Sequence, residues 1–304
     1  MALKVAVVGA GYLGQHHARI YSELGDVELS GVVDTDEERA KEIATKYSSR
    51  AYRDYRDTLM DVDALSIVVP TTEHFEIALD CLRAGKDVLV EKPIAASVSQ
   101  ADELISEAQK RNCILQVGHL ERYNPGVTAL SRMVGEPEFL EAVRLSPFLD
   151  RCFDVDVTLD LMIHDIDIIL SLVPSPVKEI RAFGFSLVTA KIDEARVWLG
   201  FENGAAASLT ASRISREKQR RLRLFQKSSV VELDYQTCAV EFRSAASPLE
   251  PEVIRPEYSE PLKEELKDFI RCVGRRERPK VSGVEGRKAL SLALEINSVM
   301  ERDR

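Results

Sequence analysis

Hydrophobic residues in the N-terminal part of the chain alternate between short apolar runs and segments of helical period. The apolar runs predict strands at Leu3–Val8, Val27–Val33, Ala64–Val69, Asp87–Val90 and Cys113–Val117. The helical segments are Leu13–Leu24, Glu37–Lys46, Glu73–Ala84 and Ser97–Arg111. Strands that alternate with helices are typical of a doubly wound parallel sheet with right-handed crossovers. The pattern therefore predicts a Rossmann domain of class α/β at residues 1–122.

The pattern changes after Asn124-Pro125. A helix is predicted over Val127–Val134, then an extended run, Phe139–Leu145, and a second helix over Leu159–Leu172. Strand-like segments then dominate, separated by turn signals: Val177–Val188, Ala195–Phe201, Ala205–Ala211, Leu222–Gln226, Val230–Tyr235 and Ala239–Arg243. The sequence predicts a second, α+β domain at residues 123–304, built on a mostly antiparallel sheet.

The C-terminal part reads as an irregular stretch followed by two helices. Prolines from Pro248 to Pro261 predict an extended segment without regular structure. Helical periods follow over Leu262–Val273 and Val284–Met300. We expect these helices, within residues 262–301, to pack back toward the first domain.

Composition and net charge limit the kinds of molecule that the chain is expected to bind. The 304 residues exceed one typical domain, and the net charge of −9 argues against nucleic acid and anionic membranes as partners. No apolar run has the length of a transmembrane helix, and Val5–Val8 lacks a signal-peptide cleavage pattern, so we expect a cytoplasmic protein. The cysteines form no C-x-x-C pair, which predicts reduced thiols outside any metal site; they are Cys81, Cys113, Cys152, Cys238 and Cys272.

A glycine loop joins the first predicted strand to the first helix. It reads Gly9-Ala10-Gly11-Tyr12-Leu13-Gly14, the order that a dinucleotide-binding loop requires. Gly9 permits the tight turn, Gly11 lets the backbone approach a pyrophosphate, and Gly14 lets the helix pack on the strand. The N–H groups at the start of the helix then suit anionic phosphates. We expect Tyr12 and Leu13 to contact the cofactor as well.

Asp34 follows the second strand, about 20 residues beyond the last glycine, where a carboxylate accepts hydrogen bonds from the adenosine ribose. It would repel a 2′-phosphate, and Thr35 and Asp36 follow it rather than a basic residue. The sequence therefore predicts NAD as cofactor. The Arg39 side chain could turn toward a 2′-phosphate, which leaves NADP as the less favoured alternative.

The ends of the next two strands carry further candidates. The loop Pro70-Thr71-Thr72-Glu73-His74 follows the third strand, and ligands gather at the carboxyl ends of parallel strands, so we expect Pro70, Thr71 and His74 to contact the cofactor. The next strand ends at Glu91-Lys92-Pro93. Lys92 could hydrogen-bond a substrate hydroxyl and stabilise the negative charge that develops on its oxygen as hydride leaves. The alternative for this motif is that Glu91 and Lys92 form an ion pair on the surface at the strand end.

Polar groups on the helix Leu159–Leu172 suggest a proton acceptor. Asp160, His164 and Asp167 stand at i, i+4 and i+7, which places them on one face. We predict His164 as the base, because imidazole accepts protons near neutral pH, with Asp160 as its partner. Two alternatives are a core histidine paired with Asp160 and a zinc site. We expect no metal, since His119 is the one obvious further ligand.

Together these residues resemble the glucose-fructose oxidoreductase, inositol dehydrogenase and MocA family, over nearly the whole chain. The resemblance implies a Rossmann domain followed by a domain with a large open sheet. It implies an active site lined by Lys92, Asp160 and His164 that oxidises or reduces a secondary alcohol of a sugar, cyclitol or nucleotide sugar. It also implies a homodimer or homotetramer formed through the C-terminal sheet.

Two segments, residues 116–125 and 160–167, look similar to bacterial UDP-N-acetylglucosamine 3-dehydrogenases. That resemblance implies oxidation of UDP-N-acetylglucosamine to a 3-keto sugar, which is later aminated in lipid A assembly. Arg122, Tyr123 and Asn124 would then bind the sugar or a phosphate, since guanidinium groups suit both. The alternative for these three residues is a capped turn that opens the next helix.

A basic cluster lies within this acidic chain and would suit a UDP diphosphate: Arg213, Arg216, Lys218, Arg220, Arg221 and Arg223. A solvated strand face or a subunit contact is the alternative for the cluster. A dehydrogenase of a free sugar or cyclitol would not need it. A dinucleotide-binding sensor without turnover is a third possibility, but it would not need Lys92, Asp160 and His164 together.

Overall fold

The computed structural model describes residues 2–148 and 155–302, and the chain divides into two compact units. The first unit comprises Met1–Leu120 and Leu262–Arg287, and the second comprises Glu121–Pro261 and Lys288–Arg304. The first unit thus adds a C-terminal segment to the N-terminal range, and Glu121 and Arg122, at the end of the range 1–122, belong to the second unit. Cys152 lies outside the described residues.

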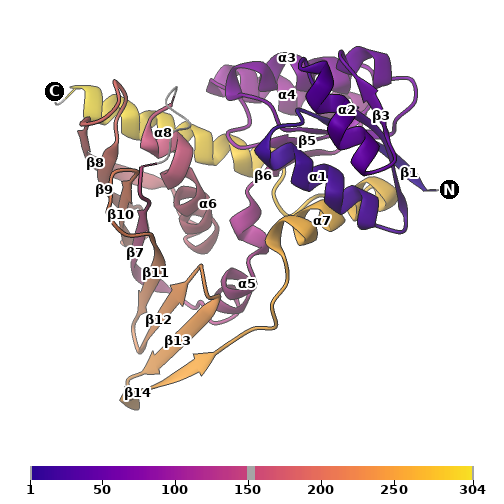
Figure 1. Ribbon diagram of the computed structural model, residues 1–304. Helices are drawn as coiled ribbons and strands as arrows, with labels where there is room; N and C mark the ends of the chain where they lie inside the picture. Colours follow the sequence, from indigo (N-terminus) through magenta and orange to yellow (C-terminus); the bar gives the residue numbers. More distant parts are fainter. Residues whose placement is uncertain (1, 149–154, 303–304) are drawn as a thin grey trace. The chain divides into compact units, whose positions relative to one another are not determined.

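The first unit contains a six-stranded parallel sheet of order β3-β2-β1-β4-β5-β6 (Figure 1). Its strands are β1 (Leu3–Val8), β2 (Val27–Val33), β3 (Arg50–Tyr52), β4 (Ala64–Ile67), β5 (Asp87–Glu91) and β6 (Leu115–Gly118). Its helices are α1 (Tyr12–Glu23), α2 (Glu37–Lys46), α3 (Thr71–Arg83), α4 (Val98–Arg111) and α7 (Pro261–Arg275), with a 3₁₀ turn η1 (Tyr55–Thr58). The predicted Rossmann architecture is confirmed. The pattern missed β3, because three residues are too few to show a period.

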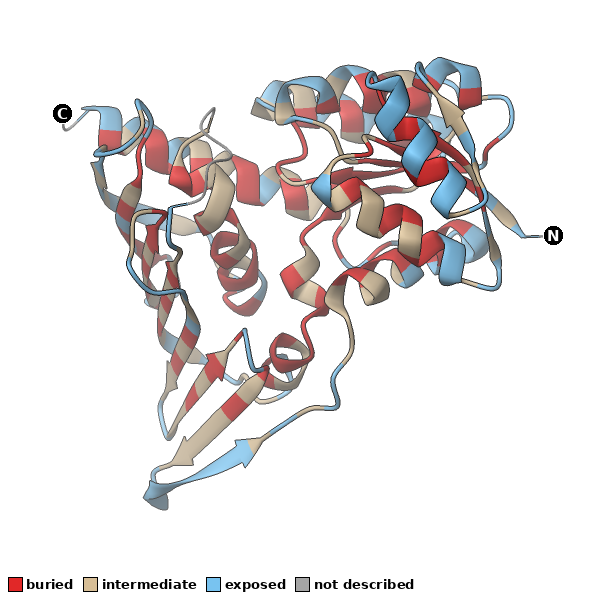
Figure 2. Ribbon diagram, in the orientation of Figure 1, coloured by how far each residue is buried: buried red, intermediate tan, exposed pale blue. Residues whose placement is uncertain are grey.

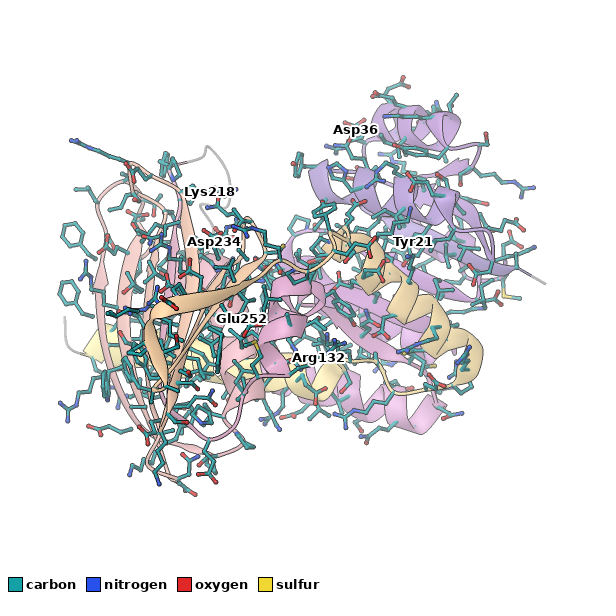
Figure 3. The ribbon with its side chains drawn as sticks, turned by 90° about the horizontal axis from the view of Figure 1, so that it is seen from below. Tyr21, Asp36, Arg132, Lys218, Asp234 and Glu252 are labelled. Atoms are coloured by element: carbon teal, nitrogen blue, oxygen red, sulfur yellow. The ribbon has the colours of Figure 1, made fainter. Side chains whose placement is uncertain are left out.

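Burial explains why these segments form a central sheet. Strands β4 and β5 are buried along their whole length, as Figure 2 shows in red, and such strands read as continuous apolar runs. The helices bury one stripe each, and Asp36, labelled in Figure 3, caps α2 by accepting a hydrogen bond from the N–H of Arg39. Leu266 and Phe269 of α7 share a hydrophobic core with residues of β1 and α1.

The second unit contains an eight-stranded sheet of order β14-β13-β12-β11-β7-β10-β9-β8. Its strands are β7 (Pro137–Leu145), β8 (Val177–Phe185), β9 (Glu194–Phe201), β10 (Ala206–Ser212), β11 (Gln219–Gln226), β12 (Ser229–Asp234), β13 (Ala239–Ser244) and β14 (Ser247–Ile254). Only β7 and β10 pair in parallel among these strands, so the predicted mostly antiparallel sheet is confirmed.

The remaining helical elements of the described residues are short apart from the last. They are η2 (Leu120–Tyr123), α5 (Pro125–Ser131), η3 (Thr158–Met162), α6 (Ile163–Leu172) and α8 (Gly283–Arg302). Apolar side chains of α6 and of the C-terminal part of α8 share one core with the strands, including Ile166, Ile296, Val197 and Leu209. Among the described helices, none is both long and apolar enough to cross a membrane.

Two local predictions need correction. The stretch from Pro248 was predicted to be irregular, but it contains β14, which pairs with β13. β14 is exposed along nearly its whole length and so has no alternating apolar pattern, and an edge strand tolerates Pro248 and Pro251 because it need not donate every N–H. The helix predicted from Leu159 instead begins as the π-helical turn η3 and becomes α-helical at Ile163.

Candidate active site

The glycine loop of the first unit is held by its own backbone. Gly9 has a φ of +96°, and a Cβ there would lie 2.2 Å from the carbonyl oxygen of Val68. A Cβ at Gly14 would lie 1.8 Å from the carbonyl oxygen of Gly9. Gly11 faces open space and precedes α1, whose first N–H groups have no side-chain cap. This end of α1 can therefore receive an anionic group.

Asp34 is anchored beside that loop. Its carboxylate accepts hydrogen bonds from the N–H groups of Ala10 and Asp36, at 2.8 and 2.9 Å. Arg39 donates to both carboxylate oxygens, at 3.2 and 3.0 Å. Burial by itself raises the pKa of Asp34, but the two N–H groups and the Arg39 guanidinium together bring it below its ordinary value. Asp34 is therefore an ionised hydrogen-bond acceptor at neutral pH.

A pocket of about 460 Å³ opens next to these groups, within the first unit. The predicted residues Gly9, Gly11, Asp34 and Pro70 all line it. Other lining residues were not predicted, because they belong to the segment around β3 and η1, which carries no motif; they include Arg53, Tyr55 and Arg56. Of the other cofactor candidates, Tyr12 is exposed and Leu13 is half-buried.

Thr71 and His74 belong to α3 rather than to a loop. His74 is buried, and its ring nitrogens lie 2.7 Å from the carbonyl oxygen of Pro93 and 2.9 Å from that of Val69. Burial lowers the pKa of His74, an effect that the two carbonyl groups oppose. Both nitrogens are used within the protein, so His74 links the segment after β4 to the segment after β5. Both carbonyl groups belong to backbone that follows a strand end of the parallel sheet.

The Glu91-Lys92-Pro93 motif stands at the end of β5, as predicted. Oε1 of the buried Glu91 carboxylate lies 3.5 Å from Nε2 of His17, and Oε2 accepts a hydrogen bond from the N–H of Lys92 at 3.2 Å. Gly118 packs directly against it, since a Cβ there would lie 2.7 Å from the carboxyl group. Lys92 itself is half-buried. The Glu91 carboxylate thus fixes the backbone that carries Lys92.

The candidate proton acceptor lies in the second unit. Asp160 belongs to the π-helical turn η3 and His164 is the second residue of α6, and both are half-buried. Asp167 is buried, and its Oδ1 lies 3.6 Å from Nη1 of Arg122. The three residues predicted to share one polar face are therefore divided between a partly exposed pair and a buried partner of Arg122.

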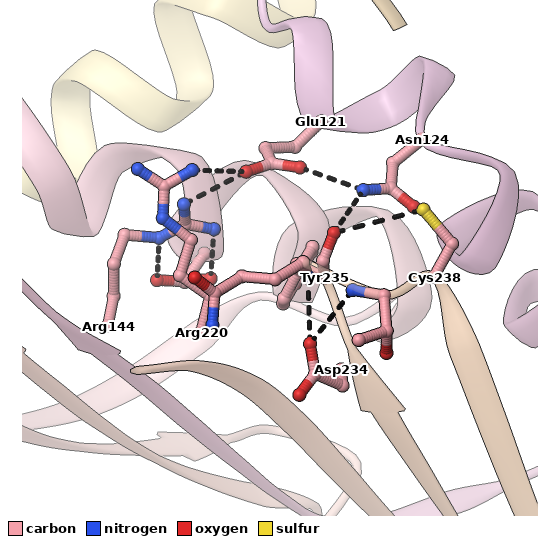
Figure 4. A network of polar contacts seen from close by, with 10 residues as sticks. Glu121, Asn124, Arg144, Arg220, Asp234, Tyr235 and Cys238 are labelled. Atoms are coloured by element: carbon pink, nitrogen blue, oxygen red, sulfur yellow. Dashed lines mark hydrogen bonds and ion pairs between the residues drawn. The ribbon is translucent and has the colours of Figure 1, made fainter. Parts of the chain in front are cut away.

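A buried guanidinium joins the segments that carry these residues (Figure 4). Arg144, on β7, donates to both carboxylate oxygens of Asp165, at 2.8 and 2.9 Å, and to Oε1 of Glu121, at 2.9 Å. Its guanidinium lies 5.0 Å from the ring centre of Tyr235. Burial disfavours the charged form, but Asp165 and Glu121 raise the pKa of Arg144 well above its ordinary value. Arg144 therefore stays charged.

The sequence pattern did not indicate Glu121, Arg144 or Asp165 as site residues. One signal could have indicated Arg144: alternation along β7 places it on the same buried face as Leu140 and Ala142. A charged residue at such a position requires charged partners nearby.

Asn124 acts as a helix cap. Its side-chain oxygen accepts a hydrogen bond from the N–H of Gly126, at 2.9 Å, and its amide donates to Glu121 and to the carbonyl group of Tyr235. Both ends of the amide are thus used, as the alternative of a capped turn requires. Tyr123 is also buried, whereas Arg122 is half-buried. Of the three predicted substrate contacts, Arg122 is the most exposed.

The basic cluster is divided between different surroundings. Arg213 is buried and donates to the carbonyl group of Val155, at 2.8 Å. Arg221 and Arg223 pair with acidic residues of neighbouring strands, and Arg220 lies 3.7 Å from Glu121. Arg216 and Lys218 are exposed in the connection from β10 to β11, where Figure 3 labels Lys218.

Within residues 2–148 and 155–302, no three His, Cys, Asp or Glu side chains form a group that could hold a metal ion.

Known protein families match both parts of the chain. Residues 3–119 match the oxidoreductase family with an NAD-binding Rossmann fold, and residues 141–229 match the GFO/IDH/MocA C-terminal domain. A UDP-N-acetylglucosamine 3-dehydrogenase from Acidithiobacillus ferrooxidans is 36% identical, over 98% of this chain and 97% of that protein. A myo-inositol 2-dehydrogenase from Thermotoga maritima is 28% identical, over 99% of this chain and 97% of that protein.

Solved structures share the fold. The structure of the Acidithiobacillus ferrooxidans enzyme superposes with a TM-score of 0.95 at 36% identity, covering 99% of both chains. A levoglucosan dehydrogenase in complex with NADH and levoglucosan superposes with a TM-score of 0.91, covering 100% of this chain and 98% of that one. Its 17% identity makes it a relative in fold.

Proposed function

Because this chain belongs to the NAD-binding oxidoreductase family of glucose-fructose oxidoreductase, inositol dehydrogenase and MocA, we propose that it oxidises UDP-N-acetylglucosamine to the 3-keto sugar nucleotide. The substrate proposal is carried by the 36% identity, over 98% of the chain, to a relative of that activity. A 3-keto product is suited to amination, as in lipid A assembly. The cytoplasm, where NAD and sugar nucleotides are available, is the proposed compartment.

The glycine loop and Asp34 fit a dinucleotide. Gly9 and Gly14 leave no room for a side chain, Gly11 faces open space, and the Asp34 carboxylate suits the ribose hydroxyls. Bound NAD would supply the hydride acceptor. We propose NAD rather than NADP, because ionised Asp34 repels a 2′-phosphate even with Arg39 beside it. Dissociation constants for NADH and NADPH test this, and equal or tighter binding of NADPH would reverse the preference.

The proposed chemistry removes a hydride and a proton from one secondary alcohol. His164 accepts the hydroxyl proton, while Lys92 donates a hydrogen bond to the oxygen as negative charge develops on it. Bound NAD would accept the hydrogen on the carbon together with its electron pair, which would leave the carbonyl bond. His164 then returns the proton to water. Asp160 orients the His164 ring, and Arg122 binds the sugar or a phosphate.

Lys92→Met tests this role of Lys92. The substitution removes the ammonium group, so turnover should fall by about 100-fold or more while NADH affinity stays unchanged. Lys86→Met is the matched control: Lys86 is also half-buried, but it precedes β5 and binds the carbonyl group of Val62 at 2.9 Å. Steady-state rates and NADH fluorescence titrations measure both quantities. Unchanged turnover in Lys92→Met would refute the mechanism.

Substrate choice separates the proposal from its alternatives. With NAD and a carbonyl trap, NADH should appear with UDP-N-acetylglucosamine and not with free N-acetylglucosamine or myo-inositol. Turnover of a free sugar or cyclitol would instead favour the second candidate, which the inositol dehydrogenase relative supports. NADH binding without turnover of any of these would favour a non-catalytic sensor.

We also propose a homodimer or homotetramer formed through the C-terminal sheet. Large aromatic side chains are exposed on β8 and β9, namely Phe183, Phe185 and Trp198. Trp198 stacks on Phe139, with ring centres 5.4 Å apart, and Phe139 also contacts Phe225. Clustered exposed apolar surface is typical of an interface. Light scattering after size-exclusion chromatography measures the mass, and a monomer at micromolar concentration would refute the proposal.

A further inference from the structure

Arg144 is a charged residue in a strand position that otherwise holds apolar side chains. Its side chain is 2% exposed, and the side chains of Asp165 and Glu121 are 2% and 6% exposed. The three groups come from β7, α6 and η2, so they meet only in the folded protein. The network continues from Glu121 to Asn124, which caps α5, and to Arg220, whose side chain is 33% exposed.

Stability alone is a weak reason for such a network. Removing three charged groups from water is costly, and well-packed apolar residues in place of a buried ion pair are often neutral or stabilising. A bidentate guanidinium–carboxylate contact does, however, fix the orientation of both groups. The arrangement is therefore better suited to holding two segments in one relative position than to adding stability.

The two segments held in this way are those that carry the candidate substrate residues. Asp165 directly follows His164 on α6, and Glu121 directly precedes Arg122 in η2. A second link joins the same elements, because Nη1 of Arg122 lies 3.4 Å from the carbonyl oxygen and 3.6 Å from Oδ1 of Asp167. Two links thus connect η2 to α6, one through Arg144 and one directly from Arg122 to Asp167. His164 and Arg122 lie next to or within these links.

We infer that Arg144 is a positioning residue, which acts through Asp165 and Glu121 to hold His164 and Arg122 in the arrangement that the substrate requires. The inference rests on the function proposed above. It predicts that loss of the guanidinium group impairs turnover while the first unit continues to bind NADH.

Arg144→Met tests this, because methionine keeps much of the volume and removes every donor. We expect kcat/KM for the sugar nucleotide to fall by about 100-fold, with kcat reduced as well as KM raised. NADH affinity should stay within about threefold of wild type. Arg144→Lys keeps the charge but cannot bind both oxygens of Asp165 and one of Glu121, so it should recover part of the loss.

Asp193→Asn is the matched control for general destabilisation. Asp193 is fully buried in the same unit, and its carboxylate accepts hydrogen bonds from the N–H groups of Leu187, Val188 and Thr189. This variant should unfold at a lower temperature yet keep its kinetic constants. If Arg144→Met is no more impaired than Asp193→Asn at equal loss of stability, Arg144 has a purely structural role and the inference is wrong.

A second readout does not depend on activity. Histidine ring signals of protein labelled with ¹⁵N at histidine can be assigned with His164→Gln. Arg144→Met should shift the His164 signal and change its pH titration, whereas Asp193→Asn should leave both unchanged. An unchanged His164 signal in Arg144→Met would overturn the inference, whether or not the wild type turns over any tested substrate. Absence of turnover by the wild type would refute the proposed function alone. If Arg144→Met does not fold, Asp165→Asn takes its place with the same expectations, and Arg144→Lys should show a smaller loss.

Discussion

The two units hold their candidate residues by different means. In the first unit the backbone does most of this: glycines permit close approaches, strand ends present Asp34 and Glu91, and N–H groups bind both carboxylates. In the second unit side chains do it, with Arg144 between Asp165 and Glu121. An arrangement based on the backbone is broken by adding a methyl group, whereas one based on side chains is broken by removing a charged group.

The largest effect is expected for Gly14→Ala. The new Cβ would lie 1.8 Å from the carbonyl oxygen of Gly9, and a backbone atom cannot move aside as a flexible side chain can. NADH affinity should fall by about 100-fold or more, as measured by fluorescence titration. Gly25→Ala is the control, since that position is exposed and a Cβ there meets nothing within 4 Å. Normal NADH binding by a folded Gly14→Ala protein would contradict the comparison.

Gly118→Ala should have an intermediate effect. Its Cβ would lie 2.7 Å from the Glu91 carboxyl group, which is a side chain and can shift. We expect turnover to fall by about tenfold, because the carboxylate that accepts the N–H of Lys92 is displaced, with NADH affinity unchanged. Gly200→Ala, also in a strand, is the control, because its Cβ would be 3.4 Å from its nearest neighbour. Loss of NADH binding in Gly118→Ala would place the effect in the glycine loop instead.

The same difference explains what the sequence could predict. Gly9, Gly11, Gly14 and Asp34 form a motif of fixed spacing along one strand–helix–strand unit, and β1 and β2 begin and end where the apolar pattern places them. Local chemistry of this kind is readable because neighbours in space are also neighbours in the chain. The residues of the glycine loop and of the Glu91-Lys92-Pro93 motif accordingly lie where they were expected.

The side-chain network could not be read in this way. Arg144 lies 23 residues from Glu121 and 21 from Asp165, and no spacing rule connects them. His74 shows the same limit, because its two carbonyl partners become neighbours only when β4 and β5 lie side by side. The apolar pattern did not predict the exposed strand β14, because this strand buries no face. Contacts that depend on the tertiary fold, and elements without a buried face, leave no periodic trace in a sequence.

The smallest effect concerns Asp34 and depends on pH. Burial opposes ionisation of this carboxyl group, but the N–H groups of Asp36 and Ala10 and the Arg39 guanidinium lower its pKa in the folded protein. A lowered folded-state pKa means that its contribution to stability is complete above the unfolded-state value of about 3.9 and is lost as the pH falls through the folded-state value. Asp34→Asn should therefore cost about 1 kcal/mol near pH 7, and the difference from wild type should shrink below about pH 4. Urea unfolding between pH 7 and pH 3 measures it, with the exposed Asp26→Asn as control. A difference that persists unchanged at the lowest pH would show that Asp34 stabilises the loop through its shape and not through its charge.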